Sequence, residues 1–178
     1  ALEGDVVAVD GETPGPGNAT LRPGKRPRPL VLRVNQGQCL DVVFKNWLAP
    51  QRQTFAPPTG VDEPEAPATR SVSLHVDGTE WRTSAMDDGS YVGKNGSSLL
   101  APSATASITY HLRAPEQGTF LLYSMGDTVS IGPGFFPVGG QLSQGMFGAL
   151  HVEPPDAEIY RSQVTHQDLA LATTGTTA

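Results

Sequence analysis

Residues 118–125 read GTFLLYSM, and this stretch decides the fold of the chain. Its apolar run from Phe120 to Tyr123 is short and continuous, as in a β-strand with sheet on both sides of it. The run therefore predicts a central strand. A central strand needs hydrogen-bonded neighbours along both edges, and the sequence offers candidates before and after it.

Two further segments have strand character and lie on either side of this one in the sequence. Residues 74–78 read LHVDG. They end a run in which Val72, Leu74 and Val76 share one face, which leaves His75 on the other face. Residues 145–154 read GMFGALHVEP, and residues 147–152 are expected to form the closing strand of the domain.

Short β-rich runs and turn signals alternate along the rest of the chain. Further strands are expected at residues 6–9, 30–34, 39–46 and 106–114, with turns at the dipeptides 77–78, 88–89 and 95–96. This pattern predicts an all-β chain of seven or eight strands, folded as a Greek-key antiparallel β-sandwich. The one helix expected is short and begins at Thr165, with Asp168 near its positive end.

Composition and charge exclude several classes of function. The chain has 178 residues, which suits one large domain, and a net charge of −6, which argues against nucleic acid as a partner. The only basic run, residues 22–28, is interrupted by prolines. It indicates a stiff surface loop, with an anion site as the alternative. No apolar run approaches the roughly 20 residues that a membrane-spanning helix needs.

The three segments at residues 74–78, 118–125 and 145–154 together resemble the first cupredoxin domain of a multicopper oxidase. In that family the segments read His-x-His-Gly, Gly-Thr-x-x-x-His-Ser-His and Gly-x-x-Gly-Ala-Leu-x-Val-Glu-Pro. The turn at residues 10–16 and the paired runs at residues 32–38 and 42–46 extend the resemblance, which covers about Asp10 to Pro154. The resemblance implies a cupredoxin-like sandwich.

The resemblance also implies four histidine ligands, half of those that hold a three-copper cluster, and this chain keeps only His75 of the four. Asp77, Tyr123 and Met125 stand at the other three positions. A carboxylate is a hard ligand that suits copper(I) poorly, and a phenol has an ordinary pKa of about 10, so it stays protonated without a metal. A thioether cannot replace an imidazole at such a cluster. We therefore expect no complete copper cluster in this chain.

Two interpretations of His75 stay open at this point. In the first, His75 is a polar side chain that is hydrogen-bonded near the rim of the sandwich. In the second, His75, Asp77 and Met125 form a residual site for a single metal ion. A blue-copper site is not expected, because Cys39 lies in an early strand and has no histidine near it.

The resemblance suggests two functions. The first is an amino-terminal cupredoxin-like domain or fragment of a multicopper oxidase, which couples oxidation of a metal ion or phenol to reduction of O2 to water. This chain would be copper-free and structural, its partners would be further cupredoxin domains or a second copper-bearing chain, and its location would be secreted, periplasmic or at the cell surface. The alternative is an independent extracellular binding module on the same fold.

The chain is expected to divide into a sandwich, residues 1–154, and a linker toward a further domain or partner, residues 155–178. Prolines 154 and 155 cannot continue a paired central strand, and the Thr/Gly-rich end has too little apolar surface to fold alone. Residues 49–68 are expected to form an exposed insertion. Residues 126–144 are expected to form a long loop that contacts a neighbouring domain through Phe135 and Phe136, with a flap folded onto its own sandwich as the alternative.

Overall fold

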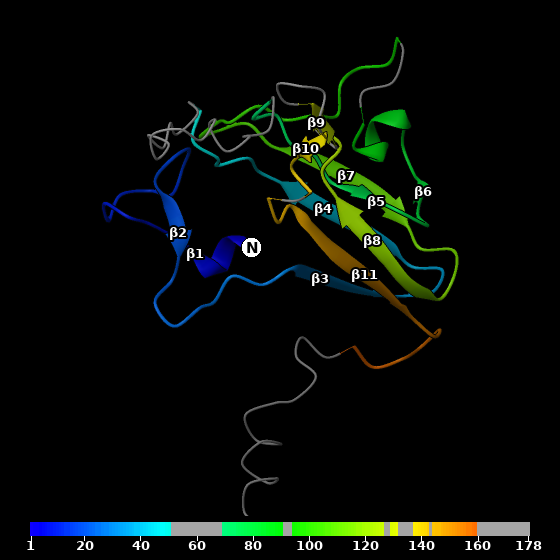
Figure 1. Ribbon diagram of the computed structural model, residues 1–178. Helices are drawn as coiled ribbons and strands as arrows, with labels where there is room; N and C mark the ends of the chain where they lie inside the picture. Colours follow the sequence, from blue (N-terminus) through cyan, green and yellow to red (C-terminus); the bar gives the residue numbers. More distant parts are fainter. Residues whose placement is uncertain (51–68, 91–93, 127–128, 132–136, 143, 160–178) are drawn as a thin grey trace, which may run out of the picture.

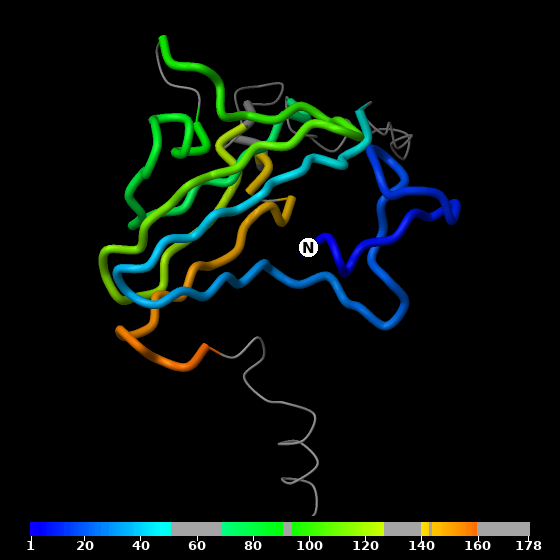
Figure 2. Tube along the Cα trace, turned by 180° about the vertical axis from the view of Figure 1, so that it is seen from behind, coloured from blue at the N-terminus to red at the C-terminus, as the bar shows by residue number. Residues whose placement is uncertain are grey.

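The computed structural model describes residues 1–50, 69–90, 94–126, 129–131, 137–142 and 144–159, and two β-sheets packed face to face form its body (Figures 1 and 2). The first sheet has the order β3-β11-β8-β5, and the second has the order β4-β7-β6. The strands of the first sheet are β3 (Leu30–Asn35), β11 (Phe147–Glu153), β8 (Gly118–Tyr123) and β5 (His75–Val76). Those of the second are β4 (Cys39–Phe44), β7 (Ile108–Arg113) and β6 (Glu80–Trp81).

The predicted all-β sandwich is confirmed, and β8 is a central strand, between β11 and β5. The described part of the chain matches a cupredoxin-like sandwich with almost no helix. One pairing differs from a wholly antiparallel arrangement, because β11 runs antiparallel to β8 but parallel to β3. The first sheet is therefore mixed. Parallel pairing of these two strands requires the chain to cross to the second sheet and back between them, which the sequence pattern does not encode locally.

The core lies between the two sheets and follows the expected alternation of side chains. The buried apolar side chains are Val34, Leu74, Val76, Tyr110, Leu112, Ala114, Leu122, Leu150 and Val152. Tyr110 is the largest of them, and its hydroxyl donates to the carbonyl oxygen of Ser98 at 2.7 Å. Burial raises the pKa of Tyr110 to about 12, so the phenol stays neutral inside the sandwich.

The strand expected at residues 71–76 is broken into two pieces. Val72 forms an isolated bridge with Leu100, and only His75–Val76 pairs with β8. Between the two pieces Ser73 is buried, and its hydroxyl accepts from the backbone N–H of Met125 at 3.0 Å. A side-chain hydrogen bond thus replaces part of the ladder, because serine can satisfy a backbone donor in place of a neighbouring strand.

Two small hairpins accompany the sandwich. β1 (Val6–Ala8) pairs with β2 (Ala19–Leu21) beside the sandwich, and β9 (Val129–Ile131) pairs with β10 (Pro137–Gly139). The second hairpin corrects the expectation that residues 126–144 lack strands. Phe135, Phe136, the expected helix after Thr165 and most of the expected insertion lie outside the described residues.

In the described ranges, helix is limited to two short 3-10 turns, η1 (Glu3–Asp5) and η2 (Ala85–Asp88). In the described part of the chain, no helix has the length and apolar character needed to cross a membrane. η2 was not expected from the sequence, and it lies in the connection between β6 and β7.

Candidate functional site

His75 lies in β5, directly opposite Tyr123 of β8, and both side chains project from the outer face of the first sheet. Their rings meet edge to face, with centroids 5.2 Å apart and an interplanar angle of 69°. The structure therefore brings together two of the four positions that the family resemblance marks, as the register of paired strands predicts. At this separation the rings form a favourable T-shaped contact.

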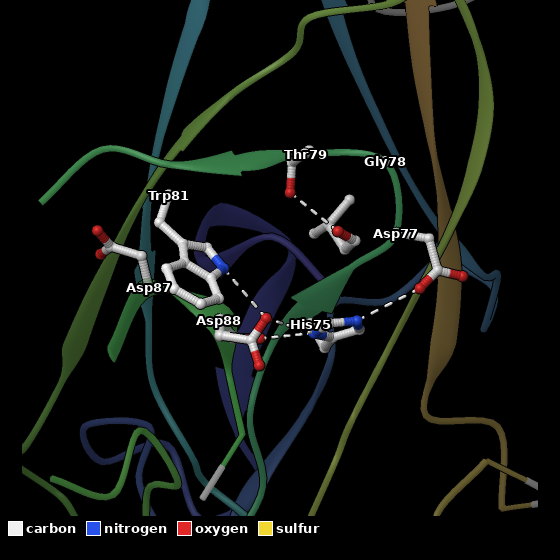
Figure 3. Close-up of a pocket in the computed structure, with 8 residues that line it drawn as sticks. His75, Asp77, Gly78, Thr79, Trp81, Asp87 and Asp88 are labelled. Carbon is white, nitrogen blue, oxygen red and sulfur yellow. Dashed lines mark hydrogen bonds and ion pairs between the residues drawn. The ribbon is translucent and has the colours of Figure 1, made fainter. Parts of the chain in front are cut away.

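Both nitrogens of the His75 ring face oxygen atoms of the same chain (Figure 3). Nδ1 is 2.6 Å from the backbone carbonyl oxygen of Asp88 and 3.4 Å from its carboxylate. A carbonyl oxygen can only accept, so Nδ1 carries a hydrogen and donates it. Nε2 is 3.3 Å from a carboxylate oxygen of Asp77. The imidazole is thus held between two aspartates, one from its own strand end and one from η2.

A glycine allows η2 to reach His75. Gly89 ends the helical turn with φ of 75°, in the left-handed region. A Cβ at this position would lie 2.2 Å from the carbonyl oxygen of Leu74. Glycine therefore permits both the turn and the close approach of η2 to β5, and the approach puts Asp88 beside His75.

Asp87 fixes the other side of η2, and its carboxylate points away from His75 (Figure 3). It is 3% exposed and accepts from the backbone N–H groups of Thr83, Ser84 and His111, at 2.9, 3.2 and 2.9 Å, and from the Thr83 hydroxyl at 2.6 Å. Burial by itself would raise the pKa of Asp87, but these hydrogen bonds outweigh it and lower the pKa to about 2. Asp87 therefore ties η2 to β7 in its charged form.

A pocket of about 140 Å³ opens beside His75. Its lining includes Asp77, Thr79, Trp81 and Asp88, and the Trp81 indole N–H donates to the Asp88 carboxylate at 3.1 Å. Burial, together with the negative charges of Asp77 and Asp88, raises the pKa of Tyr123 next to this pocket. The contact of the Tyr123 side chain with His75 that the structure shows is the one between the two rings.

The pocket contains His75 and Asp77 but not Met125. Met125 follows β8, and its backbone N–H is bound to Ser73. Within the described ranges, no group of three or more His, Cys, Asp and Glu side chains is placed to hold a metal ion. His75 and Asp77 offer one nitrogen and one carboxylate, which is too few ligands for a structural metal site. Whether His75, Asp77 and Met125 bind a metal stays a prediction.

Asp87, Asp88 and Trp81 are the residues of this site that the sequence analysis missed. A signal for two of them is present, because Ser84 precedes Asp87 by three residues, as in a capping box. Both reciprocal hydrogen bonds of the capping box form in the structure. The motif could have predicted a helical turn at residues 85–88, but not its contact with β5.

The outer face of the first sheet, on which His75 lies, carries an apolar patch. The strand register places Val31, Ala149 and Leu121 in one row and Phe147, Tyr123 and His75 in the next. Val31, Leu121 and Phe147 are 49%, 42% and 40% exposed. The outer face of a sandwich sheet is ordinarily polar, so a contiguous apolar patch on it is unusual for a surface that meets only water.

Comparisons with known proteins give low similarities. No family model matches the chain, and no curated protein matches its sequence. A multicopper oxidase from Pseudomonas thermotolerans is 17% identical over 92% of this chain and 33% of its own, with a TM-score of 0.44. Lac15 from a marine microbial metagenome is 23% identical over 72% of this chain and 26% of its own, with a TM-score of 0.42.

A copper nitrite reductase from Nitrosomonas europaea is 17% identical over 88% of this chain and 41% of its own, with a TM-score of 0.41. The chain thus spans between a quarter and about two fifths of the length of these structures. Scores at this level do not assign a family.

Proposed function

We propose that this chain is a copper-free, architectural cupredoxin-like domain of a larger multicopper oxidase. The observation that carries the proposal is the set of contacts that His75 makes. His75 is the one histidine left at the four expected ligand positions. Its Nδ1 is bound to the Asp88 carbonyl oxygen, and its Nε2 faces Asp77. The ring of Tyr123 occupies the place beside it where a second imidazole would stand. Donation from Nδ1 leaves Nε2 as the remaining ligand atom of the ring, and Nε2 lies 3.3 Å from an Asp77 carboxylate oxygen with no second imidazole of the described residues beside it.

The architectural part of the proposal rests on the apolar patch of Val31, Leu121, Ala149, Phe147 and Tyr123. A copper-bearing domain or chain of the same protein would pack on this patch and cover it. The expected location is secreted, periplasmic or at the cell surface, and the parent assembly would oxidise a metal ion or phenol and reduce O2. In this assembly the coppers would be bound by histidines of the other domains.

Copper content tests the proposal directly. The chain is loaded with copper(II), desalted and analysed for metal. We expect much less than one copper per chain, and no oxidation of a phenol or of iron(II) by the loaded chain. One tightly held copper per chain, or turnover by the chain alone, would show that His75, Asp77 and Met125 form a working site.

The apolar patch also favours a second function, an independent extracellular binding module that uses the same face. Co-purification from the native source separates the two functions. The first function predicts that a polypeptide with His-Cys-His copper motifs, or a continuation of the same chain, accompanies the domain. The second predicts a partner that contains no copper.

A further inference from the structure

A larger cavity lies beside the β1–β2 hairpin, on the side of the molecule opposite β6 in Figure 1. It has a volume of about 1120 Å³, and its walls are the N-terminal turn, the loop from β2 to β3 and the first residues of β3. We call it the basic trough, because Lys25, Arg26 and Arg28 line it together with the apolar Leu2, Leu21, Leu30 and Val31.

Two of the three cations of the basic trough have no acidic partner among the residues that the structure describes. Lys25 pairs with Asp5 at 2.8 Å, but Arg26 and Arg28 form no ion pair with any residue that the structure describes. The chain as a whole carries a net charge of −6. Within the described part of the chain these two guanidinium groups are therefore a local reversal of the overall charge. Guanidinium groups bind carboxylates strongly through paired hydrogen bonds.

The spacing of the two arginines indicates how far apart the carboxylates of a ligand should be. Arg26 precedes Pro27 and Arg28 precedes Pro29, and a residue before proline is restricted to extended backbone. Positions two apart on an extended chain lie about 7 Å from each other. Carboxylates at alternate positions of an extended peptide repeat at the same distance. The side chains between them would then be available to the apolar wall formed by Leu21 and Leu30.

We propose that the basic trough binds an extended acidic segment of a partner polypeptide, with Arg26 and Arg28 each holding one carboxylate. A peptide fits better than a small molecule. Small-molecule sites enclose most of the ligand surface, whereas residues 24–29, which form one wall here, are exposed to solvent. The trough and the His75 pocket have no lining residue in common, so the proposal does not depend on metal binding at His75, although Val31 belongs both to the trough and to the apolar patch.

Fluorescence anisotropy with a labelled peptide of alternating glutamate and leucine tests the proposal. We expect saturable binding that weakens as salt is raised, and little binding of a peptide in which glutamine replaces glutamate. Arg26→Gln and Arg28→Gln should each weaken binding by roughly tenfold, the loss expected for one charge-assisted contact. Arg22→Gln removes the same charge from the same loop but not from the trough, and it should change affinity less than threefold, roughly, through screened charge alone.

Two results would overturn the proposal. Equal losses in the Arg22, Arg26 and Arg28 variants would mean that the peptide senses only overall charge. Binding of dodecanoate without binding of the peptide would mean that the trough takes a small amphiphilic anion. Because the three arginines are exposed, the variants should keep the melting temperature of the unchanged chain, which a thermal melt verifies.

Discussion

At the scale of single residues, His75 and Asp87 hold the same turn from opposite sides. His75 contacts η2 through the backbone and carboxylate of Asp88, and Asp87 contacts β7 through the backbone of His111. Asp87 has the stronger set of contacts, since its buried carboxylate accepts four hydrogen bonds. It is therefore the single polar residue whose loss should damage the described site most.

Asp87→Asn should lower the free energy of unfolding by roughly 2–4 kcal/mol, because the new amide N–H groups face donors instead of accepting from them. Urea denaturation at neutral pH measures the change. Glu116→Gln is the matched control, since Glu116 is exposed and the change should cost less than about 0.5 kcal/mol. Equal stabilities of the two variants would contradict the role given to Asp87.

The lowered pKa of Asp87 also predicts how stability depends on pH. The pKa is about 2 in the folded chain and 3.8 without these contacts. The unfolded chain therefore takes up this proton first as the pH falls, and the stabilisation is complete above about pH 4 and lost toward pH 2. It should amount to about 2 kcal/mol. Denaturation at several pH values should show the free energy of unfolding falling between about pH 4 and pH 2 in the unchanged chain, and falling less in Asp87→Asn.

At the scale of elements, the position of η2 depends on Gly89. Gly89→Ala should cost roughly 3 kcal/mol or more, because the new methyl group would meet the Leu74 carbonyl oxygen and backbone must move. Gly145→Ala provides the control. Gly145 also has positive φ, but no atom lies within 4 Å of its Cβ position, so the change should cost only about 1 kcal/mol. Thermal unfolding of both variants checks the difference.

The pairing of β5 with β8 makes a gain of function testable. Asp77→His and Tyr123→His in one chain would put three imidazoles on the outer edge of two paired strands, with residue 123 directly opposite His75. We expect this double variant to hold copper(II) or zinc(II) after desalting, since imidazole suits both ions. The unchanged chain, under the same conditions, should not. A double variant that stays metal-free would show that Asp88 keeps His75 out of reach of a metal.

At the scale of the whole molecule, the two outer faces of the sandwich differ in what they are expected to contact. Leu121 belongs to the apolar patch on the first sheet. Val43, which is 63% exposed, lies on the outer face of the second sheet. If the first face packs on a copper-bearing domain, only changes on that face should impair assembly.

Leu121→Lys should therefore weaken association with the copper-bearing part of the parent protein, while Val43→Lys should not. Both side chains are exposed, so each variant alone should unfold within about 1 kcal/mol of the unchanged chain. Size-exclusion chromatography of each variant mixed with the copper-bearing part measures association. Denaturation of each variant alone measures its free energy of unfolding. Loss of assembly in the Val43 variant would place the interface on the second sheet instead.

The sequence by itself determined the long strands of the sandwich, β3, β4, β7, β8 and β11, and which of their side chains share a face. Alternation at residues 39–46 predicts that Val42 and Phe44 share one face opposite Val43, and in the structure they pack against the core while Val43 is exposed. The same rule puts Tyr110 and Leu112 on one side of their strand, and both are buried. These features could be predicted because alternation along a strand is local.

Only the tertiary structure decided the parallel pairing of β3 with β11, the hairpin β9–β10 and the contacts of His75. Asp88 lies 13 residues after His75, and it reaches the imidazole only because η2 folds back and Gly89 lets the two backbones touch. Such a contact depends on how whole segments pack, and no local spacing of residues encodes it. The family resemblance could therefore point to four positions in the sequence, but it could not reveal the partners that occupy His75.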